Sequence, residues 1–388
     1  MSSSSMVRLL PLCIVAFCGF TGFSILFPVI PKYAEEVLGA QSHLMVGLVV
    51  GTFYYVAALT MIPFGVLSDR TGRRILLVTG LFVCTVVPLL YIVVTSPLQL
   101  ILVRGIHGLA SASFIPAANA MVVDMSPPQR RGEAMGWFAA AIMTGFMVGP
   151  ITGGFLLNSY GFNATFYACS FTTLLALLLI LPWLRSMPEK PVLVVEAGGS
   201  AWGWLWQRRA FGALLTVSFI AFGSGTIVAF MPLYGERIGM TASHVGAIIT
   251  AIYASSILLR APAGILSDRI GRTVVILSGF VVSAAALALF SVFTTFPLLI
   301  VAGVVFGFGM GLAMTASFAL VADLASLSAR GLAMGAANSS LQAGLAIGAT
   351  AMGGVAAVAG FESMFGICGA ILAAGLVMVL FLIRRGSG

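Results

Sequence analysis

The residues that decide the fold are PFGVLSDRTGRRILLVTG at 63–80 and a second copy, PAGILSDRIGRTVVILSG, at 262–279. The copies lie 199 positions apart, and nine of their eighteen residues are identical. Each copy sets a short charged turn between two apolar runs. The same offset aligns other residues of the chain: Gly108 with Gly307, Asp124 with Asp323, Arg131-Gly132 with Arg330-Gly331, and Gly149 with Gly348. This ungapped register predicts a chain built from two similar halves.

The composition is that of a membrane protein. Of the 388 residues, 60% are hydrophobic and 8% are charged, whereas soluble domains average about 45–50% apolar and about 25% charged residues. We therefore expect a multi-pass protein of the cytoplasmic membrane of a microbe, surrounded by the lipid bilayer. The net charge of +8 then reflects the basic side of a membrane topology and not a nucleic-acid partner.

Apolar runs long enough to cross a bilayer recur along the whole chain. About 20 apolar residues span the hydrocarbon core, and twelve segments qualify: 9–31, 44–66, 75–95, 98–123, 134–157, 162–183, 210–234, 243–265, 274–294, 297–322, 332–358 and 361–383. The predicted fold class is an all-α membrane protein with twelve transmembrane helices in two pseudo-symmetric six-helix bundles. We expect the N-terminal bundle at 1–183, a cytoplasmic linker at 184–209 and the C-terminal bundle at 210–388.

The basic residues indicate how the chain is oriented. Fifteen Lys and Arg residues fall in loops on the side of the N-terminus, two fall in loops on the other side, and two, Arg104 and Arg260, fall within helices. Cytoplasmic loops of membrane proteins carry an excess of Lys and Arg. Both termini are therefore expected on the cytoplasmic side.

Four motifs resemble patterns of one transporter family, the major facilitator superfamily. GVLSDRTGRR at 65–74 resembles its signature loop between helices 2 and 3, and GILSDRIGR at 264–272 resembles a weaker copy between helices 8 and 9. GFMVGPITGG at 145–154 and GFSILFPVIP at 22–31 resemble motifs of its twelve-helix drug:proton antiporter subgroup. The resemblance covers essentially the whole chain. It implies two bundles that rock about a substrate site near the middle of the membrane.

The resemblance implies that the charged turns form a latch at the cytoplasmic face. Asp69 would meet the N-terminus of a helix in the opposite half, where the helix dipole favours a carboxylate. Arg73 would pair with Asp124, and Arg272 with Asp323. Alternatively these charges only hold the topology, although topology is insensitive to acids. The candidate gating residues are Gly65, Asp69, Arg70, Gly72, Arg73, Asp124, Asp268, Arg269, Arg272 and Asp323.

A glycine-rich motif is expected in the fifth helix. Three of its glycines recur at every fourth position, which gives a smooth face for close helix packing, and its proline is expected to bend the helix. In the second half Ala349 replaces the proline, so the feature is asymmetric. The candidate residues of this antiporter-type motif are Gly145, Gly149, Pro150, Gly153 and Gly154.

Polar residues within the apolar segments are candidates for the substrate cavity and for proton coupling. A charge inside the membrane costs at least about 2.5–3.5 kcal/mol on insertion scales, so Arg104 and Arg260 are expected to face a cavity. Alternatively, Arg260 extends toward the cytoplasmic surface, and His107 is a neutral hydrogen-bonding residue and not a titrating one. Asn338 and Gln342 are either cavity lining or packing residues. The candidates are Arg104, His107, Ser111, Tyr253, Ser256, Arg260, Asn338 and Gln342.

The first helix lacks the acid that many antiporters of this family use for cationic drugs, since none occurs from Val7 to Pro31. A cavity with two arginines and no carboxylate favours neutral lipophilic or anionic substrates. The proton carrier stays open: it is His107, Asp124 or a group of the substrate, or there is no proton coupling.

Signatures of enzymes do not occur in the sequence. His43, His107 and His244 lie in separate segments without metal-ligand or triad spacing, and no glycine-rich phosphate loop follows a strand. We expect no catalytic residues, no metal and no cofactor.

Together these features predict a monomeric transporter for a small-molecule substrate. It would work by alternating access and export a small lipophilic or amphiphilic compound against protons, as multidrug antiporters do when they confer drug resistance. Two alternatives remain: an exporter or flippase of an anionic amphiphile, sugar or metabolite, and a receptor of the same fold that binds without transport. The charged turns in both halves favour a protein that moves.

Overall fold

The structure, a computed structural model, describes residues 3–127, 130–185, 207–325 and 330–384. Helices account for nearly all of these residues. In chain order the elements are α1 (Ser3–Ile25), α2 (Ile30–Lys32), the π-helix η1 (Tyr33–Val37), α3 (His43–Thr71), α4 (Arg73–Val93), α5 (Pro97–Met125), α6 (Arg131–Arg185), α7 (Arg208–Arg237), α8 (Ala242–Ile270), α9 (Arg272–Val292), α10 (Phe296–Leu324) and α11 (Arg330–Arg384). Within the described ranges, ten helical stretches are long and apolar enough to cross a membrane. The chain is therefore a multi-pass membrane protein.

The two longest helices, α6 and α11, each change direction at a glycine. Both contain 55 residues, with non-helical backbone angles at Gly161 (φ 79°) and Gly360 (φ 80°). Positive φ is readily adopted only by glycine. An unbroken helix of this length would measure about 80 Å, more than twice the thickness of the hydrocarbon core. Each long helix is therefore two helical pieces, and the breaks fall at the segment boundaries expected from the sequence.

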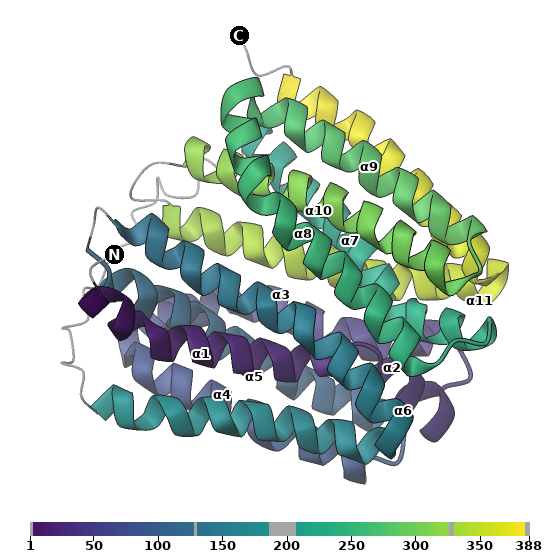
Figure 1. Cartoon of the computed structure of the whole chain (residues 1–388), viewed down its shortest axis with the longest axis horizontal. Coiled ribbons are helices and arrows are strands. Elements are labelled where there is room, and N and C mark those ends of the chain that lie inside the picture. Colours follow the sequence, from purple (N-terminus) through teal and green to yellow (C-terminus); the bar gives the residue numbers. More distant parts are fainter. Residues whose placement is uncertain (1–2, 128–129, 186–206, 326–329, 385–388) are drawn as a thin grey trace.

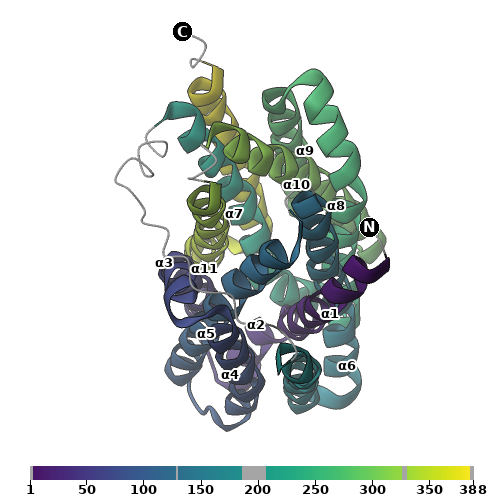
Figure 2. The same ribbon diagram turned by 90° about the vertical axis from the view of Figure 1, so that its left-hand side faces the viewer.

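The helices form two groups. In the N-terminal group α1, α3, α4, α5 and α6 pack on one another, and in the C-terminal group α7, α8, α9, α10 and α11 do the same. Figure 2 shows the first group below the second. The main contacts between the groups join α3 to α11 and α6 to α8. The expected linker at 184–209 lies mostly at 186–206, outside the described residues.

The two interfaces between the groups are copies of each other. A Cβ atom on Gly47 of α3 would collide with the carbonyl oxygen of Ala349 in α11, and one on Gly246 of α8 would collide with that of Pro150 in α6. Gly47 and Gly246 are 199 positions apart, the offset of the sequence repeat. Only glycine allows the backbones to approach so closely.

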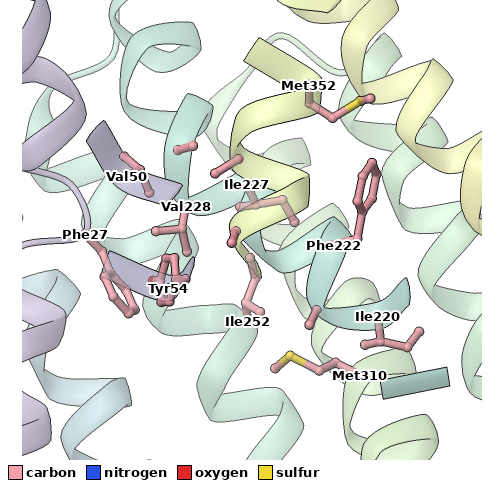
Figure 3. Packing of buried hydrophobic residues seen from close by; sticks show 14 of the residues in the cluster. Phe27, Val50, Tyr54, Ile220, Phe222, Ile227, Val228, Ile252, Met310 and Met352 are labelled. Atoms are coloured by element: carbon pink, nitrogen blue, oxygen red, sulfur yellow. The ribbon is translucent and has the colours of Figure 1, made fainter. Parts of the chain in front are cut away.

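α3 and α11 also touch nearer the charged turns, where a Cβ atom on Gly335 would lie 3.7 Å from the Ile62 side chain, but the close backbone contacts that the described glycines make between the groups all lie toward one end of the molecule. We call it the closed end; it comprises the helix ends at 26–43, 150–161, 237–246 and 346–361. Next to it, Phe27, Val50 and Tyr54 of the N-terminal group belong to the same buried cluster as Val228 and Ile252 of the C-terminal group (Figure 3).

The opposite end, which carries the N-terminus and the charged turns, is the open end. A Cβ atom on Gly65, Gly132, Gly136 or Gly331 would have no neighbouring atom within 4 Å. Figure 1 shows the two groups close together on the right and spread apart toward the left, where the N-terminus lies. The interface between the groups thus opens toward the charged turns.

Candidate functional site

Three aromatic rings mark the place where the two groups separate. The rings of Phe146 (α6) and Tyr253 (α8) stack with centroids 5.1 Å apart, and Phe27, which follows α1, lies 5.9 Å from Phe146 and 6.1 Å from Tyr253. We call these residues the aromatic triad. Toward the closed end, the Thr250 hydroxyl donates a hydrogen bond of 2.8 Å to the Met147 carbonyl across the interface. Of the three, only Tyr253 is a cavity candidate from the sequence, although Phe27 and Phe146 lie within the motifs at 22–31 and 145–154.

Arg104 is held by the backbone of α3. Its side chain is 3% exposed; Nε donates to the Val49 carbonyl at 3.3 Å and Nη2 to the Val50 carbonyl at 3.4 Å. The guanidinium carbon lies 4.7 Å from the centre of the Phe53 ring, a cation–π contact. Arg104 also borders a small pocket with Phe27 and other apolar residues, which has room for about one water molecule.

His107 lies one turn further along α5, in an aromatic surrounding. Its Nδ1 is 2.8 Å from the Tyr91 hydroxyl, and either atom can be the donor, depending on the tautomer. The Phe53 ring stands edge-on to it, with centroids 5.4 Å apart. His107 and Ser111 line a second small pocket, different from that of Arg104. This geometry fits the hydrogen-bonding interpretation of His107.

Arg260 differs from Arg104 in having no acceptor. It is half-buried on α8, and its Nε atom is buried and makes no hydrogen bond. The Ser256 hydroxyl, one turn away, is also buried and without a partner. A buried polar group left unpaired costs about 1–3 kcal/mol. Arg260 and Ser256 therefore keep hydrogen-bonding capacity that the described residues do not use.

The amides of α11 stand apart from these residues. Asn338 donates a hydrogen bond of 2.8 Å from Nδ2 to the Met334 carbonyl of its own helix, and Gln342 is buried. The hydrogen bonds of the described residues do not join either amide to Arg104, His107 or Arg260.

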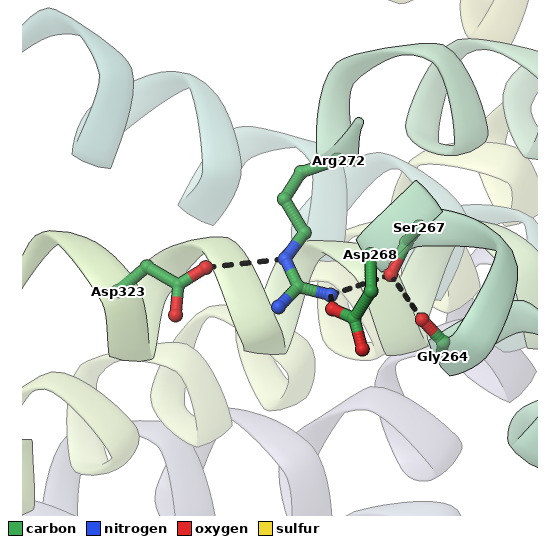
Figure 4. A network of polar contacts seen from close by, with 5 residues as sticks. All are labelled: Gly264, Ser267, Asp268, Arg272 and Asp323. Carbon is green, nitrogen blue, oxygen red and sulfur yellow. Dashed lines mark hydrogen bonds and ion pairs between the residues drawn. The ribbon is translucent and has the colours of Figure 1, made fainter. Parts of the chain in front are cut away.

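The charged turns form ion pairs within each helix group. Arg73 pairs with Asp124 and donates a second hydrogen bond, of 2.8 Å, to the Ala120 carbonyl. In the other copy, Arg272 donates from Nε to Asp323 at 3.1 Å, and its Nη1 lies 2.6 Å from Asp268 (Figure 4). The structure thus brings together the residues that the sequence pairs. These contacts join α4 to α5 in the N-terminal group, and α9 to α8 and α10 in the C-terminal group.

Among the described side chains, the remaining latch candidates form no ion pair between the groups. Arg70 and Arg269 are exposed, and a Cβ atom on Gly65 would have no atom of another element within 4 Å. Gly72, with φ 97°, forms the turn between α3 and α4. The side chain of Asp69 is outside the part of the chain that the structure describes.

The glycine-rich motif of the fifth helix faces two different partners. Cβ atoms on Gly145, Gly149 and Gly153 would meet α1 of the same group, whereas one on Gly154 would collide with the Ala242 carbonyl of α8. Pro150 supplies the carbonyl that contacts Gly246. The motif therefore contributes both to packing inside the N-terminal group and to the closed end. The non-helical backbone angles of α6 lie at Gly161 and not at Pro150.

A charged contact at the closed end is not indicated by any motif. Lys32 Nζ lies 3.0 Å from Glu36 of its own group and 3.1 Å from Glu236 of the C-terminal group. The available signal is the repeat: at an offset of 201, Pro31, Tyr33 and Glu35 align with Pro232, Tyr234 and Glu236. That alignment indicates equivalent positions but not that the two sets meet.

Comparison with known proteins gives similarity over nearly the whole chain. The sequence model of the Major Facilitator Superfamily matches residues 12–243 and 213–387. An uncharacterized MFS-type transporter of Methanocaldococcus jannaschii is 30% identical over 358 residues, which cover 91% of this chain and 92% of the relative. The multidrug resistance protein MdtG of Citrobacter koseri is 29% identical over 285 residues, covering 70% of this chain and 69% of MdtG.

Solved structures share the fold. A bacterial homologue of the human lysosomal transporter Spinster, in an inward-facing and occupied conformation, superposes with a TM-score of 0.81 at 15% identity, covering 99% of this chain and 97% of that one. The human organic anion transporter MFSD10 gives a TM-score of 0.71 at 17% identity, with coverage of 97% and 99%. Groups of ligating side chains that could hold a metal ion do not occur among the described residues.

Proposed function

Because the chain belongs to the Major Facilitator Superfamily, we propose that it exports a small lipophilic or amphiphilic compound in exchange for protons, by alternating access. The observation that carries the proposal is the contrast between the two ends of the helix groups. A binding site between them is accessible from the open end and sealed from the closed end, as one state of an alternating-access cycle requires. The relatives named as multidrug resistance proteins support efflux of lipophilic compounds.

The proposed topology has twelve membrane crossings and both termini in the cytoplasm. The breaks at Gly161 and Gly360 support two crossings for each of α6 and α11, and the excess of basic residues at the open end supports its cytoplasmic location. The two six-helix bundles, 1–183 and 210–388, are then the bodies that rock. The present state is open to the cytoplasm.

Thiol labelling tests this topology. Cys13, Cys18, Cys84, Cys169 and Cys368 are replaced by serine, and one cysteine is introduced at Gln41 or at Arg130, both of which are exposed. A membrane-impermeant maleimide added to intact cells should label Gln41→Cys and not Arg130→Cys. The reverse pattern would invert the proposed orientation.

The proposed gating elements are the ion pairs of the open end. Arg73 with Asp124 and Arg272 with Asp323 brace the helix ends that must approach each other when that end closes. Gly65 and Gly72, together with Asp69, lie where the two groups would meet. Their contacts with the opposite group would form only in the other state.

Flux across a membrane tests the transport function. The purified protein is reconstituted in proteoliposomes that enclose a pH-sensitive dye, and chloramphenicol, a neutral amphiphile, or dansylate, an anionic one, is added under an imposed pH gradient. An exchanger produces a substrate-dependent proton flux, which protein-free vesicles lack. Binding without flux under any gradient would identify a receptor instead. Loss of the pH signal in His107→Ala, with binding retained, would assign the proton step to His107; full coupling would remove His107 from it.

A further inference from the structure

Arg260 points to a substrate property that the proposed function leaves open. We infer that the substrate of the proposed transport carries an anionic group that Arg260 binds and an aromatic body that the aromatic triad contacts. The inference rests on the proposed function for the location of the site, between the two helix groups.

The position of Arg260 on its helix directs it toward the opposite group. Ala242 and Gly246, on the face of α8 that packs against α6, precede it by eighteen and fourteen residues, about five and four turns of helix. Tyr253, which stacks on Phe146 of α6, precedes it by about two turns. Arg260 therefore lies on the face between the groups, on the open side of the aromatic triad.

Among the described residues, Arg260 has no ion-pair partner. Its Nε is buried and donates no hydrogen bond. The nearest acid along α8, Asp268, is eight residues away, about 12 Å along the helix, and pairs with Arg272. Arg104, by contrast, donates two hydrogen bonds to α3. Of the two membrane arginines, Arg260 is the one available to a ligand.

The sequence repeat shows that the fold does not need an arginine here. The position equivalent to Arg260 in the first half, 199 residues earlier, is Met61, which is buried. The neighbouring equivalent pair, Tyr54 and Tyr253, keeps its aromatic ring in both halves. Because a methionine of similar length fills the equivalent position of the first half, packing alone does not require an arginine at position 260. Ligand binding explains the arginine better.

The surroundings favour an anion over a cation. The facing segments of α6 (134–157) and α8 (242–267) contain no acid, so these segments offer no carboxylate that could bind a cation beside Arg260. A guanidinium forms two parallel hydrogen bonds to a carboxylate, sulfonate or phosphate oxygen pair. The buried Ser256 hydroxyl, one turn from Arg260, offers one more donor. Stacked rings nearby favour a flat aromatic body.

Two matched probes separate the contribution of the anionic group to binding from that of the aromatic ring system. Dansylate and dansylamide share one naphthalene ring system, but the first carries a sulfonate and the second a neutral sulfonamide. Their affinities are measured by equilibrium dialysis against the full chain in lipid nanodiscs, with empty nanodiscs subtracted. The wild-type protein should bind dansylate about tenfold or more tightly than dansylamide, since charge-assisted hydrogen bonds reach that strength.

The variants then assign each part of the preference. Arg260→Met, which installs the residue of the other half, should abolish the preference and leave dansylamide affinity within about twofold of wild type, while Arg260→Lys should keep part of it because the charge remains. Tyr253→Leu should weaken both probes by a similar factor. Arg237→Met is the control, since it removes a charge from the exposed end of α7, and it should leave both affinities unchanged. Dansylamide binding also reports whether each variant is folded. If Arg260→Met does not fold, Arg260→Gln replaces it in the test.

The other outcomes overturn either the inference or the proposed transport function, and they distinguish the two. Equal wild-type affinities, or tighter dansylamide binding, would remove the anionic group from the substrate. A preference that persists in Arg260→Met would remove Arg260 from its recognition. If neither dansyl probe binds while chloramphenicol drives proton flux, the substrate class is wrong and the transport function stands. If dansylate binds through Arg260 without any flux, the anion site stands and the transport function fails.

Discussion

The two ends of the α6 and α8 pair differ although the same two helices form both. At the closed end Gly154 and Gly246 press against backbone carbonyls of the opposing helix, so that no side chain fits between them. At the open end Gly136 of α6 has no atom near it, and Gly264 of α8 has only the Thr315 methyl group of its own helix group, at 4.0 Å. In this pair of helices, direct backbone packing therefore joins the two groups at the closed end and not at the open end.

This difference follows from the physics of helix association in lipid. Lipid tails are as apolar as leucine, so burying apolar side chains drives association only weakly, and close packing through small residues becomes the main attraction. The charges of the open end brace helices inside one group and do not oppose separation of the groups. The change of state must therefore exchange one set of backbone contacts for another.

The largest effect on stability is expected from adding a side chain to the glycine contact at the closed end. Gly246→Leu places a side chain where the Pro150 carbonyl lies, and overpacking of this kind costs about 1–3 kcal/mol. The apparent Tm of the purified protein should fall by several degrees, since about 2–4 °C corresponds to 1 kcal/mol in proteins of 150 residues and above. Gly136→Leu, on α6 in the open end, should leave Tm unchanged. Equal losses of Tm in the two variants would show that α6 and α8 pack equally closely at both ends.

Sequence alone predicts the parts of this architecture that the repeat encodes. Arg73 and Asp124 are separated by 51 residues, as are Arg272 and Asp323, so one pairing implies the other, and both ion pairs are present. The expected family is confirmed, and the expected segment boundaries coincide with Gly161 and Gly360, because only glycine allows the turn found there.

The conformational state could not be predicted from the sequence, and the reason is the same repeat. Gly47 and Gly246 at the closed end, and Gly65 and Gly264 at the open end, are equally repeated. Which end is closed depends on a free-energy difference of a few kcal/mol between whole-molecule packings. The aromatic triad and the missing acceptor of Arg260 likewise arise from tertiary packing of helices far apart in sequence. Residue type and spacing do not encode them.

An intermediate effect is expected from the ion pairs of the open end. Arg272→Gln removes the contacts with both Asp268 and Asp323, but these acids are more than half exposed, and such pairs contribute at most about 1 kcal/mol. The loss in Tm should be smaller than that of Gly246→Leu and should shrink in 1 M NaCl, where the screening length is about 3 Å. Arg269→Gln, exposed and outside the described ion pairs, is the matched control and should change nothing. A loss as large as that of Gly246→Leu would mean that the charges contribute to holding the groups together.

The smallest effect concerns the ion pair between Lys32 and Glu236, which joins the two groups at the closed end. Lys32 pairs with Glu236 between the groups and with Glu36 within its own group. Double-mutant cycles on thermal stability with Lys32→Met, Glu236→Gln and Glu36→Gln should give coupling energies of about 0.2–1 kcal/mol for each pair. In the Gly246→Leu background only the coupling between Lys32 and Glu236 should disappear, because the added side chain separates the two groups. The coupling between Lys32 and Glu36 should remain, because these residues lie one helical turn apart in the same group. If both couplings persist there, the closed end tolerates a leucine without separating, and backbone packing is not what holds it together.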